Sequence, residues 1–297
     1  MSKTELVKAA EKLVLANKAA DIDACLDSGE DFDALTSLSS QISVRYHKTL
    51  ARKPMNAELE AALKERIAFA GKVTDDSDDN DTGDLTNTDK KHETCAAIAD
   101  RFQVSGYKVA RAISEMLFNT KKSFIEMMDD DYQDSVDPDL YAEMLVCMGS
   151  DPYNSQPCNQ MQESIGIEFE EYLVERLREK NLCFETEADS RLRGKSKTPD
   201  VLFTIPVALP ACEATNNLPT IVNWIDSKAM YADEETLREH IEQLRWYINR
   251  YGRGIVIYWR GYTDTIKESP LYKSTNGMIV ILDDVPQDWI LPVKETA

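Results

Sequence analysis

The stretch Thr220–Ala229, TIVNWIDSKA, decides the expected fold and chemistry of this chain. Its first half is mainly apolar and predicts a buried strand, which ends in Asp226 and Lys228. In an extended strand these two side chains project from the same face, so a carboxylate and an ammonium meet at one site. A D-x-K triplet occurs by chance in a chain this charged. A triplet at the end of a buried strand indicates a functional site instead.

A second carboxylate begins another apolar stretch, Lys197–Pro206, KTPDVLFTIP. Proline is acceptable at the start of a strand, and its fixed φ helps to hold the following Asp200 in place. The alternative interpretation is that Asp200 is a turn residue that closes the preceding loop.

Two helices contribute further polar residues. In Ile165–Leu177, IGIEFEEYLVERL, Glu170 shares a face with the apolar residues three, four and seven positions later, so we expect it to point inward. Gln243 and Tyr247 form an i, i+4 pair on a second helix. Taken alone, this pair fits ordinary polar residues at a packing interface.

The second half of the chain predicts alternating helices and strands. We expect helices at 162–181 and 233–251, and strands at 182–187, 200–207, 221–228, 254–259 and 278–282, with a basic loop before the second strand. The order αβββαββ implies a mixed sheet with helices packed against it, in the α+β or α/β class. Gly252 is the expected end of the second helix.

The first half predicts helices and a change of composition. Residues 1–73 form an N-terminal helical region, 74–90 an acidic linker, 91–150 a helical domain and 160–297 the mixed-sheet domain. Residues 93–117 predict a helix-turn-helix, with Ser105 capping a second helix, Gly106–Leu117, that carries Lys108 and Arg111. An ordinary helical hairpin fits the same pattern.

Composition restricts the classes of protein to consider. The chain has 297 residues, 42% hydrophobic and 29% charged, with no apolar run long enough to span a bilayer and no apolar signal segment at the N-terminus. We therefore expect two soluble domains inside the cell and no membrane association. Six scattered cysteines and three histidines argue against a zinc site or a disulfide framework, and no organic cofactor is expected.

The net charge of −19 opposes indiscriminate binding to a polyanion. Residues 162–297 hold 16 Lys and Arg against 23 Asp and Glu, a net −7, and the first 161 residues carry the other −12. The excess acid therefore lies mostly outside the mixed-sheet domain. Carboxylates that hold a divalent cation would account for part of the rest.

Together the four motifs resemble the PD-(D/E)xK nuclease superfamily, in which a helix Glu, a PD, a (D/E)xK and a Q-x-x-x-Y follow in this order. Here they correspond to Glu170, Pro199 with Asp200, Asp226 with Lys228, and Gln243 with Tyr247. The resemblance implies a restriction-endonuclease-like αβββαβ domain that hydrolyses phosphodiester bonds with a metal. Order and placement make the match specific, whereas each motif alone is weak.

Three longer stretches look like the eukaryotic codanin-interacting nuclease family with its TPD motif. They are Lys197–Ala208, Val222–Asp233 and Tyr247–Tyr262. This resemblance implies a nuclear or cytoplasmic nuclease with a codanin-like protein partner. Where the family has Glu, this chain has Asp226. The first helix, Gly166 to Glu170, resembles archaeal Holliday junction resolvases, which favours structured DNA over RNA and a homodimer by fold analogy.

The resemblance also assigns roles. Asp200, Asp226, Glu170 and the Ser227 carbonyl would hold Mg²⁺ or Mn²⁺, which prefer hard oxygen ligands. Lys228 would position water or neutralise the developing phosphorane, while Gln243 and Tyr247 brace the site or touch the phosphate.

Substrate contacts are expected from a basic cluster, Arg191, Arg193, Lys195 and Lys197. In the alternative interpretation this cluster is a solvated loop, neutralised by Glu185, Glu187 and Asp189. Trp246 and Tyr251 are expected in the core. Two other functions stay open: a nucleic-acid-binding regulator that uses the helix-turn-helix, and an interaction subunit that holds a codanin-like partner.

Overall fold

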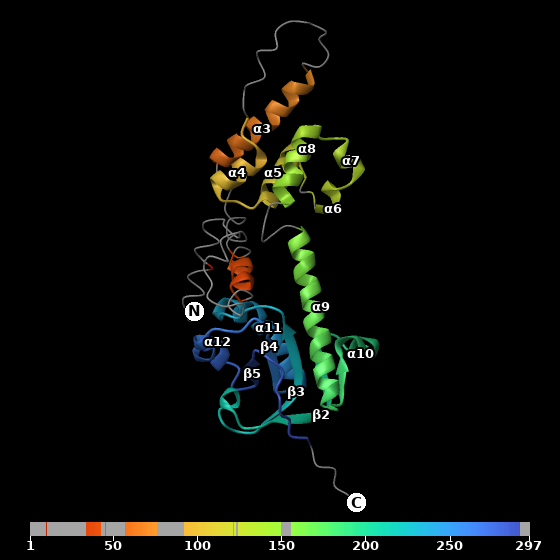
Figure 1. The fold of residues 1–297 in the computed structure, drawn as a ribbon, viewed down its shortest axis with the longest axis vertical. Helices are drawn as coiled ribbons and strands as arrows, with labels where there is room; N and C mark the ends of the chain where they lie inside the picture. The colour runs from red at the N-terminus through yellow and green to blue at the C-terminus, as the bar shows by residue number, and fades with distance from the viewer. Residues whose placement is uncertain are drawn as a thin grey trace, which may run out of the picture. The chain divides into compact units, whose positions relative to one another are not determined.

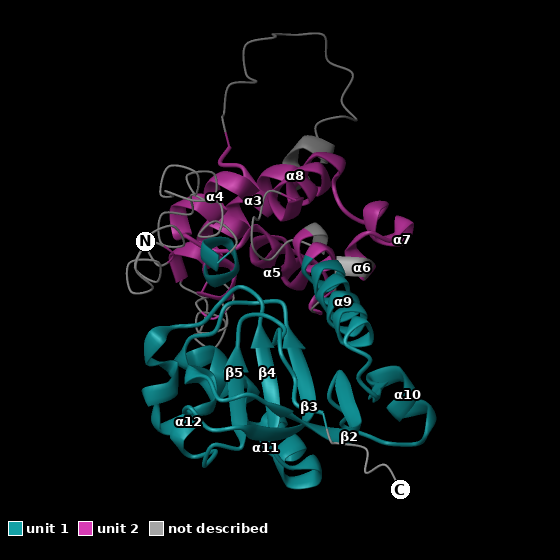
Figure 2. Ribbon diagram, turned by 60° about the horizontal axis from the view of Figure 1, so that its bottom comes forward, with its two compact units in different colours: residues 1–9, 23–38, 162–297 teal, residues 10–22, 39–161 magenta. Residues whose placement is uncertain are grey.

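The computed structural model describes residues 34–42, 57–75, 92–120, 124–149 and 156–291, with Ala10, Arg45 and Lys122. The chain divides into two compact units (Figure 2): unit 1 comprises residues 1–9, 23–38 and 162–297, and unit 2 comprises 10–22 and 39–161. The first two residues of the predicted acidic linker, 74 and 75, end a described helix; the rest of the linker and much of the predicted N-terminal region lie outside the described residues. None of the described helices is long and apolar enough to cross a membrane.

Unit 2 is helical in its described part. Its helices are α3 (Ala57–Asp75), α4 (Cys95–Phe102), α5 (Gly106–Phe118), α6 (Phe124–Met127), α7 (Asp130–Gln133) and α8 (Pro138–Gly149). Ile98 of α4, Ile113 of α5 and Met144 of α8 are completely buried in one shared core.

The helices α4 and α5 form where the helix-turn-helix was predicted, and three residues separate them. Thr94 caps α4 by accepting a hydrogen bond from the Ala97 amide. Ser105 occupies the corresponding position before α5, but its side chain makes no capping hydrogen bond, so that detail of the prediction is wrong. The use of this pair in DNA binding stays a prediction.

A polar network ties three segments of unit 2 together around Glu143 of α8. Its carboxylate accepts hydrogen bonds from Arg66 Nε at 3.1 Å and from the Cys95 amide at 3.0 Å, and it lies 2.7 Å from His92 Nε2. Burial acts to raise the pKa of Glu143, but the hydrogen bonds from Arg66, His92 and Cys95 lower it to about 2. Glu143 is therefore held as a carboxylate.

Unit 1 combines helices with a five-stranded mixed sheet (Figure 1). Its elements are α9 (Gln156–Glu179, in this unit from Gln162), β1 (Phe184–Thr186), α10 (Glu187–Leu192), β2 (Val201–Leu209), η3 (Glu213–Thr215), β3 (Thr220–Lys228), α11 (Glu234–Tyr251), β4 (Gly254–Tyr258), η4 (Asp264–Glu268), α12 (Pro270–Lys273) and β5 (Ile279–Leu282). The strands lie in sequence order. The β1–β2 and β2–β3 pairs are antiparallel, and the β3–β4 and β4–β5 pairs are parallel.

The mixed sheet and the α+β class agree with the prediction, but element bounds differ in places and the short helices η3, η4 and α12 were not predicted. The first helix begins at Gln156, before the predicted start. The predicted basic loop contains the short helix α10, which begins at a capping box between Thr186 and Asp189.

Helices α9 and α11 pack against opposite faces of the sheet. Ile225 of β3 shares a buried cluster with Leu173 and Leu177 of α9. Its neighbour Trp224 lies in a second cluster with Leu244 and other apolar residues of α11. Successive residues of a strand point to opposite faces, so β3 supplies both cores in turn.

The ends of α11 follow from its sequence. Asp233 Oδ1 accepts a hydrogen bond from the Thr236 amide at 2.7 Å and caps the first turn. Gly252, at φ 84°, ends the helix in a conformation that suits glycine. The predicted helix, 233–251, therefore matches α11 with its N-cap residue.

Candidate catalytic site

The pairing of β2 with β3 brings the two predicted aspartates together. Val201 is the antiparallel partner of Ile225, so Asp200, just before β2, lies beside Asp226. The Ser227 amide donates a hydrogen bond of 2.6 Å to Asp200 Oδ2. Asp200 is thus fixed by the backbone of the strand that carries Asp226, which accounts for its place better than a turn role does.

Lys228 completes this group from the same face of β3. Its Nζ lies 2.8 Å from Asp226 Oδ2, with 16% of the lysine side chain and 1% of the aspartate side chain exposed. The contact has the distance of an ion pair, but Asp226 Oδ2 has no well-directed hydrogen bond among the described residues. A buried carboxylate oxygen therefore remains incompletely satisfied at the site.

The charges of the group perturb one another. Burial, followed by the negative charge of Asp226, raises the pKa of Asp200 well above its usual value. Burial acts to lower the pKa of Lys228, but attraction to Asp226 and Asp200 raises it overall, so the lysine stays an ammonium. Two close acids with one cation form an environment that favours additional positive charge.

Glu170 lies in the electrostatic field of this group but does not point inward as predicted. Its side chain is exposed. The inward face of α9 instead carries Phe169, which stacks on Trp259 with ring centroids 4.9 Å apart, and then Leu173 and Leu177 at successive four-residue steps. Partial burial and the charge of Glu187 raise the pKa of Glu170, and Lys228 opposes that rise.

Gln243 and Tyr247 form a chain of hydrogen bonds that ends on the TPD segment, residues 198–200. Gln243 Nε2 donates to Tyr247 Oη at 2.7 Å, and Tyr247 Oη donates to the Thr198 carbonyl at 3.1 Å. Burial, with the nearby charge of Asp226, raises the pKa of Tyr247, so the phenol keeps its proton for this bond. The pair holds the segment that carries Asp200.

Ser227 turns its side chain away from the acids. Its Oγ accepts a hydrogen bond of 2.7 Å from Trp259 Nε1. Because it follows Asp226 on the strand, only its backbone belongs to the side of the sheet on which the acids lie. Its predicted role as a carbonyl ligand stays a prediction.

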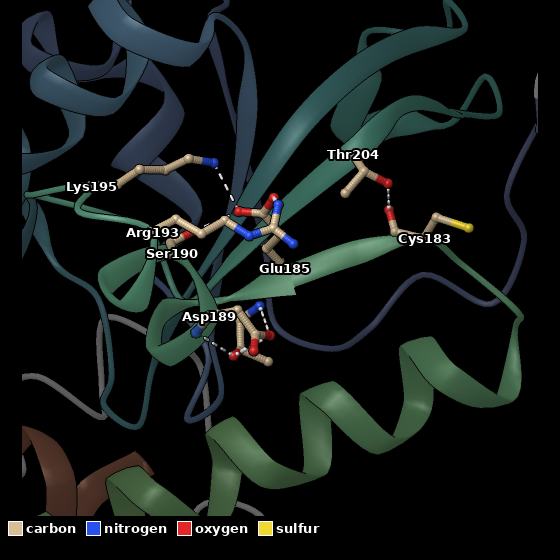
Figure 3. A network of polar contacts seen from close by, with 8 residues as sticks. Cys183, Glu185, Asp189, Ser190, Arg193, Lys195 and Thr204 are labelled. Carbon is tan, nitrogen blue, oxygen red and sulfur yellow. Dashed lines mark hydrogen bonds and ion pairs between the residues drawn. The ribbon is translucent and has the colours of Figure 1, made fainter.

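Most of the basic cluster is paired with acids, as Figure 3 shows around Glu185. Lys195 Nζ lies 2.8 Å from Glu185, and Arg193 pairs with the same carboxylate. Outside that view, Arg191 lies 2.7 Å from Glu187. A hydrogen bond from Lys195 lowers the pKa of Glu185. These pairings correspond to the alternative interpretation of the cluster.

Lys197 differs from the other three. Its Nζ lies 3.6 Å from the ring centroid of Trp246, a cation–π contact. Trp246 is 55% exposed, so its expected place in the core is wrong. The apolar face of α11 includes Ile241 and Leu244. Trp246 follows Leu244 by two residues, which turns it away from that face, and this spacing can be seen in the sequence. Tyr251 is partly buried against the α11 core.

Lys108 and Arg111 both lie on α5 in unit 2, where Arg111 is exposed and Lys108 is half-buried. They belong to a different unit from Asp200, so the structure gives no spatial relation between them and the two aspartates.

The donors at the site suit a hard divalent cation. Within the described residues, no three His, Cys, Asp or Glu side chains are arranged to hold a metal ion. The incompletely satisfied Asp226 Oδ2 and the raised pKa of Asp200 nevertheless fit a cation between these two acids. Glu170 would have to turn inward to join them.

Comparison with known proteins defines the class. The family model described as "Protein of unknown function TPD sequence-motif" matches residues 136–285, which include the strands and helices that carry the site. The chain belongs to this TPD-motif family, which confirms the recognition made from its motifs.

The similar curated proteins carry one name, CDAN1-interacting nuclease 1. The Xenopus laevis protein is 35% identical over 131 residues, which cover 44% of this chain and 41% of that protein. The Homo sapiens protein is 34% identical over 142 residues, 48% of each chain. The chain thus spans just under half of the length of these relatives. No solved structure matches it.

Proposed function

We propose that this protein is a metal-dependent nuclease of the PD-(D/E)xK type, with an αβββαβ catalytic core. The observation that carries the proposal is the group formed by Asp200, Asp226 and Lys228, in which two acids and an ammonium share one end of neighbouring strands. The names of the related proteins support the same activity.

Each residue has a task in this proposal. Asp200 and Asp226 hold Mg²⁺ or Mn²⁺, with Glu170 and the Ser227 carbonyl as further ligands. When bound, the cation would lower the pKa of the attacking water and stabilise negative charge at the phosphate. Lys228, kept protonated, stabilises negative charge that develops on the phosphoryl oxygens. Tyr247, braced by Gln243, holds the TPD segment in register with β3.

The proposal extends to substrate and partner. We favour structured DNA over RNA, contacted by the basic cluster and by Lys108 and Arg111 of a helix-turn-helix built from α4 and α5. A codanin-like protein is the proposed partner, in the nucleus or cytoplasm, because the relatives are named for that interaction. We also propose a homodimer, which suits a two-fold symmetric substrate.

The test is cleavage of linear, flapped, splayed and four-way DNA, and of RNA, with Mg²⁺, Mn²⁺ or chelator. Wild-type protein is compared with Asp200→Asn and Asp226→Asn, and with Asp288→Asn as a matched control at an exposed position of the same unit. We expect metal-dependent products from the wild type and the control, and at least a hundredfold loss in the two site variants.

A folded wild-type protein that cleaves no substrate of the panel with either metal would overturn the proposal. The second candidate function, an interaction subunit, would then take its place. The neutralised basic residues Arg191, Arg193 and Lys195 favour that candidate. Capture of a codanin-like partner by the Asp200→Asn variant, without metal or nucleic acid, would support it.

A further inference from the structure

A pocket outside the acid group lies beside the TPD segment. It has a volume of about 480 Å³ and is lined by Ser196, Lys197, Trp246, Asn249 and Arg250. Trp246 and Arg250 are four residues apart on α11, so they lie one above the other on the same face. The pocket therefore combines an exposed aromatic ring with two cations.

The pocket is fastened to the chain that leads to Asp200. Arg250 Nη1 donates a hydrogen bond of 2.6 Å to the Ser196 carbonyl, and Tyr247 Oη donates to the Thr198 carbonyl. Asp200 follows Lys197 by three residues, a reach of at most about 10 Å. A group bound in the pocket thus lies close to the proposed scissile phosphate.

The two cations of the pocket differ from the paired cations of Figure 3. Among the residues that the structure describes, neither Lys197 nor Arg250 has a carboxylate within ion-pair distance, whereas Arg193 and Lys195 share Glu185. Arg250 uses one donor on a carbonyl, and a guanidinium has five. Both cations can therefore meet an anionic ligand without first breaking an ion pair.

The ring of Trp246 already has a cation on its face. The ammonium of Lys197 lies 3.6 Å from the ring centroid, and the attraction between the cation and the ring keeps the lysine beside Trp246. Lys197 holds φ at 52°, a backbone region that residues other than glycine adopt where the surroundings impose it. The fold thus maintains this contact at some conformational cost.

We propose that the pocket binds one unpaired nucleotide next to the scissile phosphate. The base stacks on Trp246 in place of the Lys197 ammonium, and the displaced Lys197 and Arg250 bind the neighbouring phosphate. A base inside a duplex has both faces covered by its neighbours, so only an unpaired base can take this position. The inference rests on the proposed nuclease function and specifies its substrate as one with unpaired nucleotides at the cleavage point.

The experiment measures binding without cleavage. The Asp200→Asn protein is titrated with labelled single-stranded DNA, single-stranded RNA, a splayed fork and a blunt duplex of equal length. Trp246→Ala, Trp246→Phe and Lys197→Ala are added in that background, with Arg238→Ala as the control, an exposed cation at the other end of α11. Phenylalanine keeps a stacking face, so it separates stacking from mere folding of the helix.

We expect Trp246→Ala to weaken binding of the single strand and fork tenfold or more, and binding of the duplex less than twofold. Trp246→Phe should keep the affinity for the single strand and fork within about threefold of the Asp200→Asn protein. Lys197→Ala should weaken binding of the same ligands, and Arg238→Ala should leave all affinities unchanged. The DNA and RNA arms show which sugar the pocket accepts. Equal loss for duplex and unpaired ligands, or no loss for any, would overturn the inference.

The outcome separates this inference from the proposed function. If wild-type protein cleaves duplex DNA and Trp246→Ala cleaves it equally well, with no change in binding, the pocket proposal fails and the nuclease stands. If the unpaired ligands bind through Trp246 but wild-type protein cleaves nothing, the pocket stands and the nuclease proposal fails.

Discussion

Asp200 and Asp226 are two acids held side by side by the backbone of adjacent strands. The Ser227 amide fixes Asp200, and Lys228 offsets only part of the combined negative charge. Without a cation this arrangement destabilises the folded protein, as charged active sites commonly do. The thermal unfolding midpoint therefore measures cation binding at these two aspartates and does not depend on cleavage.

We predict that Asp200→Asn raises the thermal unfolding midpoint of the metal-free protein at neutral pH. Asparagine keeps an oxygen for the Ser227 amide and removes the repulsion, and each kcal/mol gained should raise the midpoint by about 2–4 °C. Because burial raises the pKa of Asp200, the charged form costs stability above that pKa. The difference between the two proteins should therefore disappear in acid.

The same experiment includes metal. Mg²⁺ should raise the midpoint of the wild type more than that of the variant, because it binds the folded state through Asp200. Differential scanning calorimetry measures both effects. An equal Mg²⁺ shift in the two proteins would contradict the assignment of Asp200 as a ligand.

Spacing in the sequence identified which acids belong together, but not how each one is held. Asp226 and Lys228 could be placed because a strand alternates strictly between two faces. Glu170 was misplaced because Phe169 competes for the inward position of α9 and stacks on Trp259, a residue ninety positions away. Such a contact between distant segments has no local signature.

At the scale of elements, unit 2 depends on close packing between its helices. Gly106 at the start of α5 lies against α8, and a Cβ atom there would overlap the Cys147 carbonyl. Gly166, inside α9, is the contrasting case, since a Cβ atom would meet nothing within 4 Å in the described part of the chain apart from its neighbours and the backbone of its own helix. The two glycines allow packing and helix propensity to be separated.

We predict that Gly106→Ala lowers the free energy of unfolding by about 1–3 kcal/mol, because backbone must move to admit the methyl group. Gly166→Ala should raise it by about 0.5–1 kcal/mol, because alanine loses less conformational freedom in a helix than glycine does. Urea denaturation measures both. A neutral Gly106→Ala variant would show that α5 and α8 are not as tightly packed as described.

Element boundaries were predictable where the sequence carries its own stop signals. Asp233 and Gly252 delimit α11, and both were visible in the sequence. Helix α10 was missed because three of its six residues are charged and only a capping box, Thr186 with Asp189, indicates a helix. A segment this short depends on its cap and on neighbouring strands rather than on periodicity.

At the scale of the whole molecule, the two units respond to acid in opposite ways. Protonation of Asp200 relieves repulsion in unit 1, whereas protonation of Glu143 breaks the polar network of unit 2. The pKa of Glu143 is lowered relative to the unfolded chain. Its stabilising contribution is therefore complete above about pH 4.5 and is lost as the pH falls towards 2.

We predict that Glu143→Gln destabilises the protein by about 2–3 kcal/mol at pH 7, because Arg66 keeps a buried charge without its partner. The difference from wild type should shrink as the pH falls from 4.5 to 2. Urea denaturation at a series of pH values measures it. Asp139→Asn, at an exposed position of the same helix, serves as control and should stay within about 0.5 kcal/mol. A penalty that does not depend on pH would contradict the role given to the charge.

The alternation of helices and strands was enough to predict a mixed sheet but not its strand order. Spatial order and strand direction depend on which strands pair. The parallel pair β3–β4 requires the crossover through α11, and the parallel pair β4–β5 requires the crossover through η4 and α12. That information becomes available only when distant segments are in contact.

Two hydrogen bonds from α11 hold the TPD segment, and they have a consequence for recognising distant members of this family. Arg250 and Tyr247 contact the carbonyls of Ser196 and Thr198, and every amino acid has a carbonyl. The Thr198 hydroxyl is buried and has no hydrogen-bond partner among the described residues. For these two hydrogen bonds, the path of the backbone matters and the identities of the residues at positions 196 and 198 do not. A sequence search for the T-P-D motif would therefore miss proteins that keep this backbone path with other residues, whereas a comparison of structures would find them.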